Sequence, residues 1–97
     1  MLSSFEKDIS LRKMHVEFLA IPRRLAGVSH VDVQAETLGQ LLTTLAVQFP
    51  SLGEFITLNK LHPSFSASLN GDQFVNDPRT VLGENDHVLI LSADAGG

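Results

Sequence analysis

Residues 86–97, DHVLILSADAGG, are the most informative segment of this chain. Val88 and Ile90 share one face of an extended segment, so this alternation predicts a strand from His87 to Leu91. Small side chains follow the strand, and the sequence closes on Gly96-Gly97. A strand that runs directly into a narrow tail suits a domain whose last residues enter another protein.

The Gly96-Gly97 pair gives the tail a chemical use. Glycine has no Cβ, so it takes backbone angles that are closed to other residues. Two glycines can therefore carry a C-terminal carboxylate through a narrow slot into a partner's active site. Six extended residues reach roughly 20 Å, and the tail is Ser92-Ala93-Asp94-Ala95-Gly96-Gly97. A loosely ordered chain end, common at termini, is the alternative that the tail alone leaves open.

An amphipathic helix is predicted upstream, between Thr37 and Pro50. Thr37 and Gln40 have the spacing of a capping box, in which the hydroxyl and the amide each satisfy a backbone N–H at the helix start. Pro50 cannot continue a helix and ends it. The residues of its apolar face recur at intervals of three and four: Leu38, Leu41, Leu42, Leu45 and Phe49.

Strands are predicted on both sides of this helix. Period-2 alternation begins at Met14 and ends before Pro22, and a second run follows a turn at Ala26-Gly27. After the helix we expect a short helical turn near Leu52, and Asn70-Gly71 marks a tight turn between two more strands. The predicted strands cover residues 14–20, 30–34, 65–69, 73–75 and 87–91. The element order is β-β-α-β-β-β, which is typical of an α+β sandwich of two layers.

The composition describes one globular domain. Of the 97 residues, 43% are hydrophobic and 19% are charged, which is ordinary for a folded chain of this length. The 7 basic and 11 acidic residues, with a net charge of -4, argue against nucleic acid or an anionic membrane as partner. No apolar run has membrane-spanning length and no secretion signal opens the sequence, so we expect a cytoplasmic location.

Cysteine is absent from the sequence. Its absence excludes disulfides, thiolate zinc sites, cysteine nucleophiles and persulfides. If this protein handles sulfur, the sulfur must therefore sit on its C-terminal carboxyl group.

Several short motifs occur here in a recognisable order: residues 14–20 leading to Leu25-Ala26-Gly27, then Thr37-Leu38, Leu69-Asn70-Gly71, Gly83-x-x-Asp86-x-Val88 and Gly96-Gly97. In order and spacing they resemble the ubiquitin-like β-grasp sulfur carriers, above all the small subunit of molybdopterin synthase and the thiamine-pathway carriers. The resemblance covers residues 14–97 and leaves residues 1–13 as an N-terminal extension. It implies a mixed sheet packed on one main helix, with the first and last strands parallel at its centre and residues 92–97 as a flexible tail.

The resemblance implies a carrier that is not itself an enzyme. A carboxylate is a poor electrophile, so a partner adenylyltransferase resembling ubiquitin-activating enzyme would join Gly97 to AMP, with ATP and magnesium bound on that partner. A persulfide supplied by a sulfurtransferase would then leave Gly97 as a thiocarboxylate. This group would donate its sulfur to a precursor held by an acceptor synthase subunit. The chain itself would bind no cofactor and hold no catalytic residue.

Three leucines are candidates for docking the activating enzyme. Leu19, Leu89 and Leu91 are out of phase with the inward positions of the two strands that are expected at the centre of the sheet. Exposed apolar patches commonly mark contact surfaces, so we expect these side chains to position the tail on the partner. The alternative is that the N-terminal extension covers them. Asp94 stands where the family often has an apolar residue, which leaves the identity of the partner open.

Other candidate sites are weaker. The histidines His15, His30, His62 and His87 lack the spacing of a metal site, and we predict none. His15 and His87 fall in outward phase on the first and last strands, where a solvated pair is the favoured interpretation. No serine has the context of a nucleophile.

Three function classes follow. The leading one is a sulfur carrier, foremost the molybdopterin synthase small subunit in molybdenum cofactor biosynthesis. Acceptors in thiamine, amino-acid or secondary-metabolite synthesis remain open, because a fold does not settle the acceptor. A ubiquitin-like modifier that forms isopeptide bonds with lysines would use the same activated end. In the third class, a non-catalytic β-grasp interaction module, the glycines are incidental.

Overall fold

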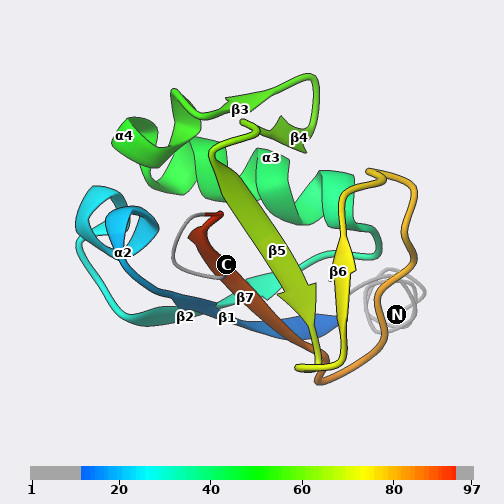
Figure 1. The fold of residues 1–97 in the computed structure, drawn as a ribbon. Coiled ribbons are helices and arrows are strands. Elements are labelled where there is room, and N and C mark those ends of the chain that lie inside the picture. The colour runs from blue at the N-terminus through cyan, green and yellow to red at the C-terminus, as the bar shows by residue number, and fades with distance from the viewer. Residues whose placement is uncertain (1–11, 94–97) are drawn as a thin grey trace, which may run out of the picture.

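The computed structural model describes residues 12–93 (Figure 1). The first strand begins at Lys13, one residue before its predicted start, and the last ends at Ser92, one residue later than predicted. In chain order the elements are β1 (Lys13–Phe18), α2 (Ile21–Ala26), β2 (His30–Gln34), α3 (Leu38–Gln48), α4 (Pro50–Gly53), β3 (Ile56–Thr57), β4 (Lys60–Leu61), β5 (Phe65–Leu69), β6 (Gln73–Val75) and β7 (His87–Ser92).

The main sheet has five strands in the order β2-β1-β7-β5-β6. The central pair, β1 and β7, is parallel, with Val16 beside Val88, whereas the other pairs are antiparallel. Helix α3 lies across one face of this sheet, with α4 and the β3–β4 hairpin beyond it (Figure 1). The mixed sheet, the β-β-α-β-β-β order of its elements and the single covering helix confirm the predicted β-grasp.

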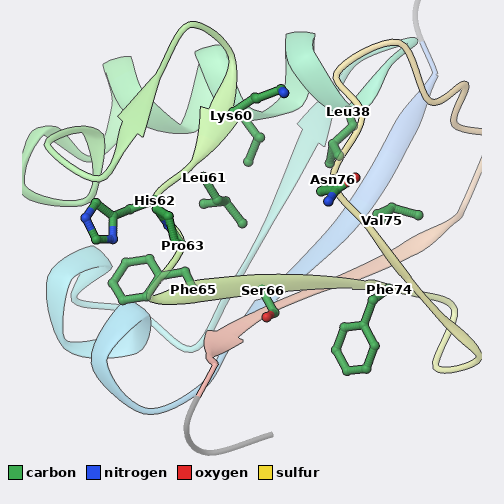
Figure 2. A pocket seen from close by; sticks show the side chains of 11 residues that line it. Leu38, Lys60, Leu61, His62, Pro63, Phe65, Ser66, Phe74, Val75 and Asn76 are labelled. Atoms are coloured by element: carbon green, nitrogen blue, oxygen red, sulfur yellow. The ribbon is translucent and has the colours of Figure 1, made fainter.

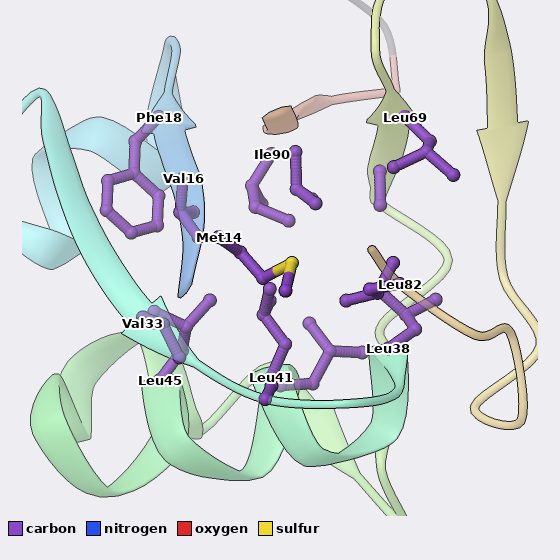
Figure 3. Close-up of a cluster of buried hydrophobic side chains, with 14 of the residues drawn as sticks. Met14, Val16, Phe18, Val33, Leu38, Leu41, Leu45, Leu69, Leu82 and Ile90 are labelled. Carbon is purple, nitrogen blue, oxygen red and sulfur yellow. The ribbon is translucent and has the colours of Figure 1, made fainter. Parts of the chain in front are cut away.

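The core lies between α3 and the sheet (Figure 3). Apolar residues of β1 and β7 point toward the leucine face of α3, as the two periodicities predict. Phe49, at the end of α3, packs edge-to-face on Phe18, with ring centroids 5.7 Å apart. The side chains at most 1% exposed include Met14, Val16, Phe18, Leu38, Leu41, Leu42, Leu45, Leu52, Leu82, Val88 and Ile90.

The start of α3 has a modified capping box. The hydroxyl of Thr37 accepts the N–H of Gln40 at 3.2 Å, as predicted. The Gln40 side chain reaches back to the N–H of Glu36 at 2.8 Å, one residue before the cap. The helix ends at Gln48, directly before Phe49 and Pro50.

Helix α2 and the two short strands β3 and β4 were not predicted. The connection between β1 and β2 contains the one-and-a-half-turn helix α2, which has Pro22 in its first turn and Gly27 in a left-handed cap at φ 80°. The β3–β4 hairpin turns at Leu58 and Asn59, which have φ values of 53° and 64°. A turn with two positive φ values normally has the sequence Asn-Gly. Because Leu58 occupies its first position, the sequence pattern does not indicate this turn. At Asn70-Gly71 that signal is present, and the predicted turn is confirmed, with φ values of 54° and 74°.

Among residues 12–93, no helix is long and apolar enough to cross a membrane.

Candidate functional site

The candidate site is the C-terminal end of β7, where the sequence analysis placed the start of the tail. Ser92 is still part of β7, pairs with Phe65 of β5 and is 8% exposed. Its hydroxyl accepts the N–H of Ile21 at 3.4 Å, and the N–H of Ala93 is donated to the carbonyl of Ser64 at 2.7 Å. The prediction that Ser92 belongs to the flexible tail is therefore wrong, because Ser92 is paired within β7. Ala93 follows the strand directly and is held by its bond to Ser64.

The remaining predicted tail residues, Asp94, Ala95, Gly96 and Gly97, lie outside the described residues. Four residues follow Ala93 in the sequence. Fully extended, they span at most roughly 14 Å, less than the reach of the six-residue tail.

The chain bends sharply next to this end of β7. Ala20, which follows β1, has φ 60° and ψ -131°, angles that a non-glycine residue rarely adopts. Its carbonyl accepts the N–H groups of Arg23 and Arg24, and the N–H of Leu19 is donated to the carbonyl of Ile90. The bend thus places α2 against the end of β7 and leaves Leu19 beside it.

The three predicted docking leucines differ in exposure. Leu19 is 39% exposed, Leu89 is half-buried and Leu91 is only 8% exposed. The prediction that Leu91 offers an exposed contact is wrong. Leu91 lies on a central strand, with Ser66 of β5 as its cross-strand partner, so outward phase alone does not make it accessible.

Phe74 is an apolar residue of this face that the sequence analysis did not single out. It is 67% exposed and lies opposite Ser68, which in turn lies opposite Leu89. Figure 2 shows its ring on the side of the strands away from Leu38 and Leu61. The Asn70-Gly71 turn sets the register of β6 against β5. It was therefore the sequence signal that could have placed Phe74 on the outer face. We call Leu19, Leu89 and Phe74 the outer apolar patch.

A row of titratable side chains occupies the same face toward β2. His15 and His87 are neighbours across the parallel pair, as expected for outward positions on the first and last strands. The Nδ1 of His15 lies 2.8 Å from an oxygen of Asp32, and the Nε2 of His87 lies 3.1 Å from an oxygen of Glu17. The hydrogen bond from His15 holds the pKa of the Asp32 carboxyl below its ordinary value. Within residues 12–93, no group of three or more histidine and acidic side chains is arranged to hold a metal ion.

A hollow of about 440 Å³ lies between α3, β4 and the β5–β6 edge (Figure 2). Its polar side chains include Lys60, His62 and Asn76. The Nδ1 of His62 accepts the N–H of Ser64 at 3.0 Å, so this nitrogen is already engaged. Lysine, imidazole and amide groups around an apolar floor can bind a ligand. Among the described residues of this hollow, no hydrogen bond joins a nucleophilic side chain to a general base.

The sequence profile of the ThiS family matches residues 16–97. This chain belongs to the ThiS family. Membership confirms the predicted kinship with the ubiquitin-like β-grasp sulfur carriers. No curated protein sequence matches the chain significantly.

Solved structures resemble this ThiS-family chain over most of its length. Small archaeal modifier protein 1 from Methanosarcina acetivorans has a TM-score of 0.74 and 23% identity, covering 90% of this chain and 98% of that one. A structure of the BexX/CysO complex of Amycolatopsis orientalis has a TM-score of 0.70 and 21% identity, covering 87% and 99%. A Pyrococcus furiosus protein named provisionally as molybdopterin converting factor subunit 1 has a TM-score of 0.70 and 18% identity, covering 84% and 97%. At these identities the likeness establishes the shared fold.

Proposed function

We propose that this ThiS-family chain is a sulfur carrier whose Gly97 carboxylate is adenylated by a partner enzyme and converted to a thiocarboxylate. The main observation behind this proposal is that hydrogen bonds fix the C-terminal end of β7. Ser92 and Ala93 are fixed by α2 and by the residue before β5, four residues short of Gly97. A fixed origin reduces the conformational freedom that a short tail loses when it enters an active site.

The proposed chemistry takes place on partner proteins. The Gly97 carboxylate attacks the α-phosphate of ATP on the adenylyltransferase, with magnesium bound there, and pyrophosphate leaves. The terminal sulfur of a persulfide then displaces AMP and forms an acyl disulfide. A second thiol attacks the sulfur that belongs to the donor protein's cysteine. The S–S bond breaks, and the sulfur attached to the acyl group leaves as the Gly97 thiocarboxylate. The chain contributes a carboxylate and a surface, and it acts as a recharged cosubstrate in the cytoplasm rather than as an enzyme.

The outer apolar patch is our proposed docking surface for the activating enzyme. Leu19 lies beside the end of β7, and Phe74 extends the patch to the other edge of the sheet. The apolar side chains lie on the face of the sheet opposite α3, where an isolated antiparallel layer would ordinarily be polar. Docking on this face would bring the partner's active site next to Ala93.

The acceptor that we favour is a molybdopterin precursor held by the large synthase subunit. The Pyrococcus neighbour, whose name refers to molybdopterin conversion, supports this choice by its fold. The neighbour that is titled a modifier protein supports a second candidate, in which the activated Gly97 forms isopeptide bonds with lysines. Acceptors in thiamine, amino-acid or secondary-metabolite synthesis would use the same thiocarboxylate.

Intact-protein mass spectrometry of the full chain, with and without the cognate activating enzyme, tests the proposal. A mass increase equal to the exchange of one oxygen for sulfur, mapped to Gly97, is the expected result. Conjugates to lysines of other proteins would point to the modifier instead. An unmodified mass in the presence of enzyme, ATP and a sulfur source would contradict both and leave an interaction module, as would full activity of a chain that lacks Gly97.

A further inference from the structure

The titratable row on the outer face of the sheet consists of three imidazoles and two carboxylates on adjacent strands. In the β1–β2 register His15 lies opposite Asp32 and Glu17 lies opposite His30, while His87 of β7 lies beside His15. All five side chains line one hollow. We call this set the imidazole–carboxylate surface: His15, Glu17, His30, Asp32 and His87.

Each imidazole of this surface has a polar contact. His15 contacts Asp32 at 2.8 Å, His87 contacts Glu17 at 3.1 Å and the Nδ1 of His30 lies 2.9 Å from the Ser29 hydroxyl. The side chains in the two ion pairs are between 44% and 51% exposed. They are therefore open to a partner as well as to solvent.

Imidazole is the side chain whose charge ordinarily changes near physiological pH, so three histidines make the charge of this surface sensitive to pH. With neutral imidazoles the two carboxylates make it an anionic site. With three protonated imidazoles the same surface carries a net positive charge. The charge therefore changes sign without any movement of the backbone.

The other charged groups around the surface do not cancel this change. The ammonium of Lys13, at the start of β1, attracts the Asp32 carboxylate of this surface. Glu84 accepts the backbone N–H of Lys13 at 3.1 Å. Asp86, just before β7, accepts bonds from the Gly83 N–H and the Asn70 amide. On the far side of β7, strand β5 presents the uncharged Ser66 and Ser68 outward.

The imidazole–carboxylate surface is continuous with the outer apolar patch, because Glu17 lies directly beside Leu89. A protein that covers the leucines must also cover or border Glu17. When His87 is neutral, its 3.1 Å contact with Glu17 supplies a hydrogen bond but no counter-charge. Burying a carboxylate without a counter-charge is costly, so a well-fitting partner brings guanidinium or ammonium groups to this border.

We propose that the imidazole–carboxylate surface binds a cationic patch on the activating enzyme and that protonation of its histidines releases this partner. The inference rests on the proposed function, since it assigns a chemistry to the edge of the same docking face. Protonation turns two half-exposed contacts between this surface and the partner's cationic groups from attraction to repulsion. This changes the affinity by about tenfold.

The test measures the dissociation constant of the full chain for the cognate adenylyltransferase, without ATP, at pH 7.5, 6.5 and 5.5. The wild-type chain is expected to bind about tenfold more weakly at pH 5.5 than at pH 7.5. The double variant His15→Gln/His87→Gln should lose most of this pH dependence. His62→Gln, which alters an exposed histidine elsewhere, should keep it. Comparing variants cancels the titration of the enzyme, and urea unfolding at each pH verifies that each variant is folded.

Three outcomes would overturn the inference. Tight wild-type binding at every pH, or equal pH dependence in wild type and double variant, would reject the imidazole–carboxylate surface but leave the sulfur-carrier proposal intact. A folded wild-type chain that fails to bind the enzyme at any pH would reject both.

Discussion

Ala93 donates its backbone N–H to the carbonyl of Ser64 at 2.7 Å, one residue beyond the end of β7. This bond ties the last described residue of the chain to the segment just before β5. It makes Ala93, rather than Ser92, the point from which the reach of Gly97 is measured.

Replacing Ala93 with proline removes this donor, because proline has no backbone N–H. We expect the free energy of unfolding to fall by about 0.5–1.5 kcal/mol and adenylation of Gly97 to slow. Ala93→Ser keeps the N–H and should resemble the wild type in both measurements, made by urea unfolding and by pyrophosphate release. Equal values for the two variants would show that the bond contributes neither stability nor positioning.

Leu19→Glu tests the outer apolar patch. Leu19 is 39% exposed and the charged side chain can reach water in the free protein, so the fold should persist. On the partner the same carboxylate would be buried against an apolar surface, and we expect adenylation to fall at least tenfold. Val47→Glu, on the exposed face of α3 at 77% exposure, is the matched control and should adenylate normally. Normal adenylation of both variants would remove the patch from the interface.

Leu45→Ala tests the packing of α3 on the sheet. Leu45 is fully buried, so its truncation loses burial free energy and leaves a cavity, at a cost of about 2–5 kcal/mol. Val47→Ala, half a turn away and exposed, should change the unfolding free energy by less than about 0.5 kcal/mol. Urea unfolding followed by circular dichroism measures both, and similar values would contradict the assignment of the buried face.

Thr37→Ala removes the side-chain cap of α3. The N–H of Gln40 then loses its acceptor at 3.2 Å, and we expect a loss of about 1 kcal/mol of stability. Thr44→Ala, on the exposed surface of the same helix, removes a hydroxyl that caps nothing and should be nearly neutral. A Thr37→Ser variant, which retains the acceptor oxygen, should recover most of the loss in thermal unfolding.

The hydrogen bond from His15 predicts an acid-side effect at Asp32. Because the folded-state pKa of Asp32 lies below its ordinary value of 3.8, the ionised carboxylate stabilises the fold above that pH. The contribution is lost as the pH falls through the lowered pKa. In His15→Ala the pKa of Asp32 should rise toward 3.8 in a carboxyl ¹³C NMR titration. Asp77, whose pKa is lowered by Arg79, serves as internal control and should not move.

Elements with strong local signals were predictable. The apolar face of α3, its Thr37 cap and the Asn70-Gly71 turn each depend on residues close in sequence, and all three are present. The β3–β4 hairpin was missed because Leu58 occupies a positive-φ position that sequence statistics reserve for asparagine and glycine. Helix α2 was missed because it is too short to show a periodic apolar face.

The order of the five main-sheet strands around α3 and the inward face of each of these strands could be predicted from the sequence, because periodicity and residue type are local properties. The burial of Leu91, the anchoring of Ser92 and Ala93 and the pairing of His15 with Asp32 arise only in the folded chain. These features depend on strand register between β1, β2, β5 and β7, which joins residues far apart in the chain. Register is selected by the packing of the whole sheet on α3, so no short segment contains it.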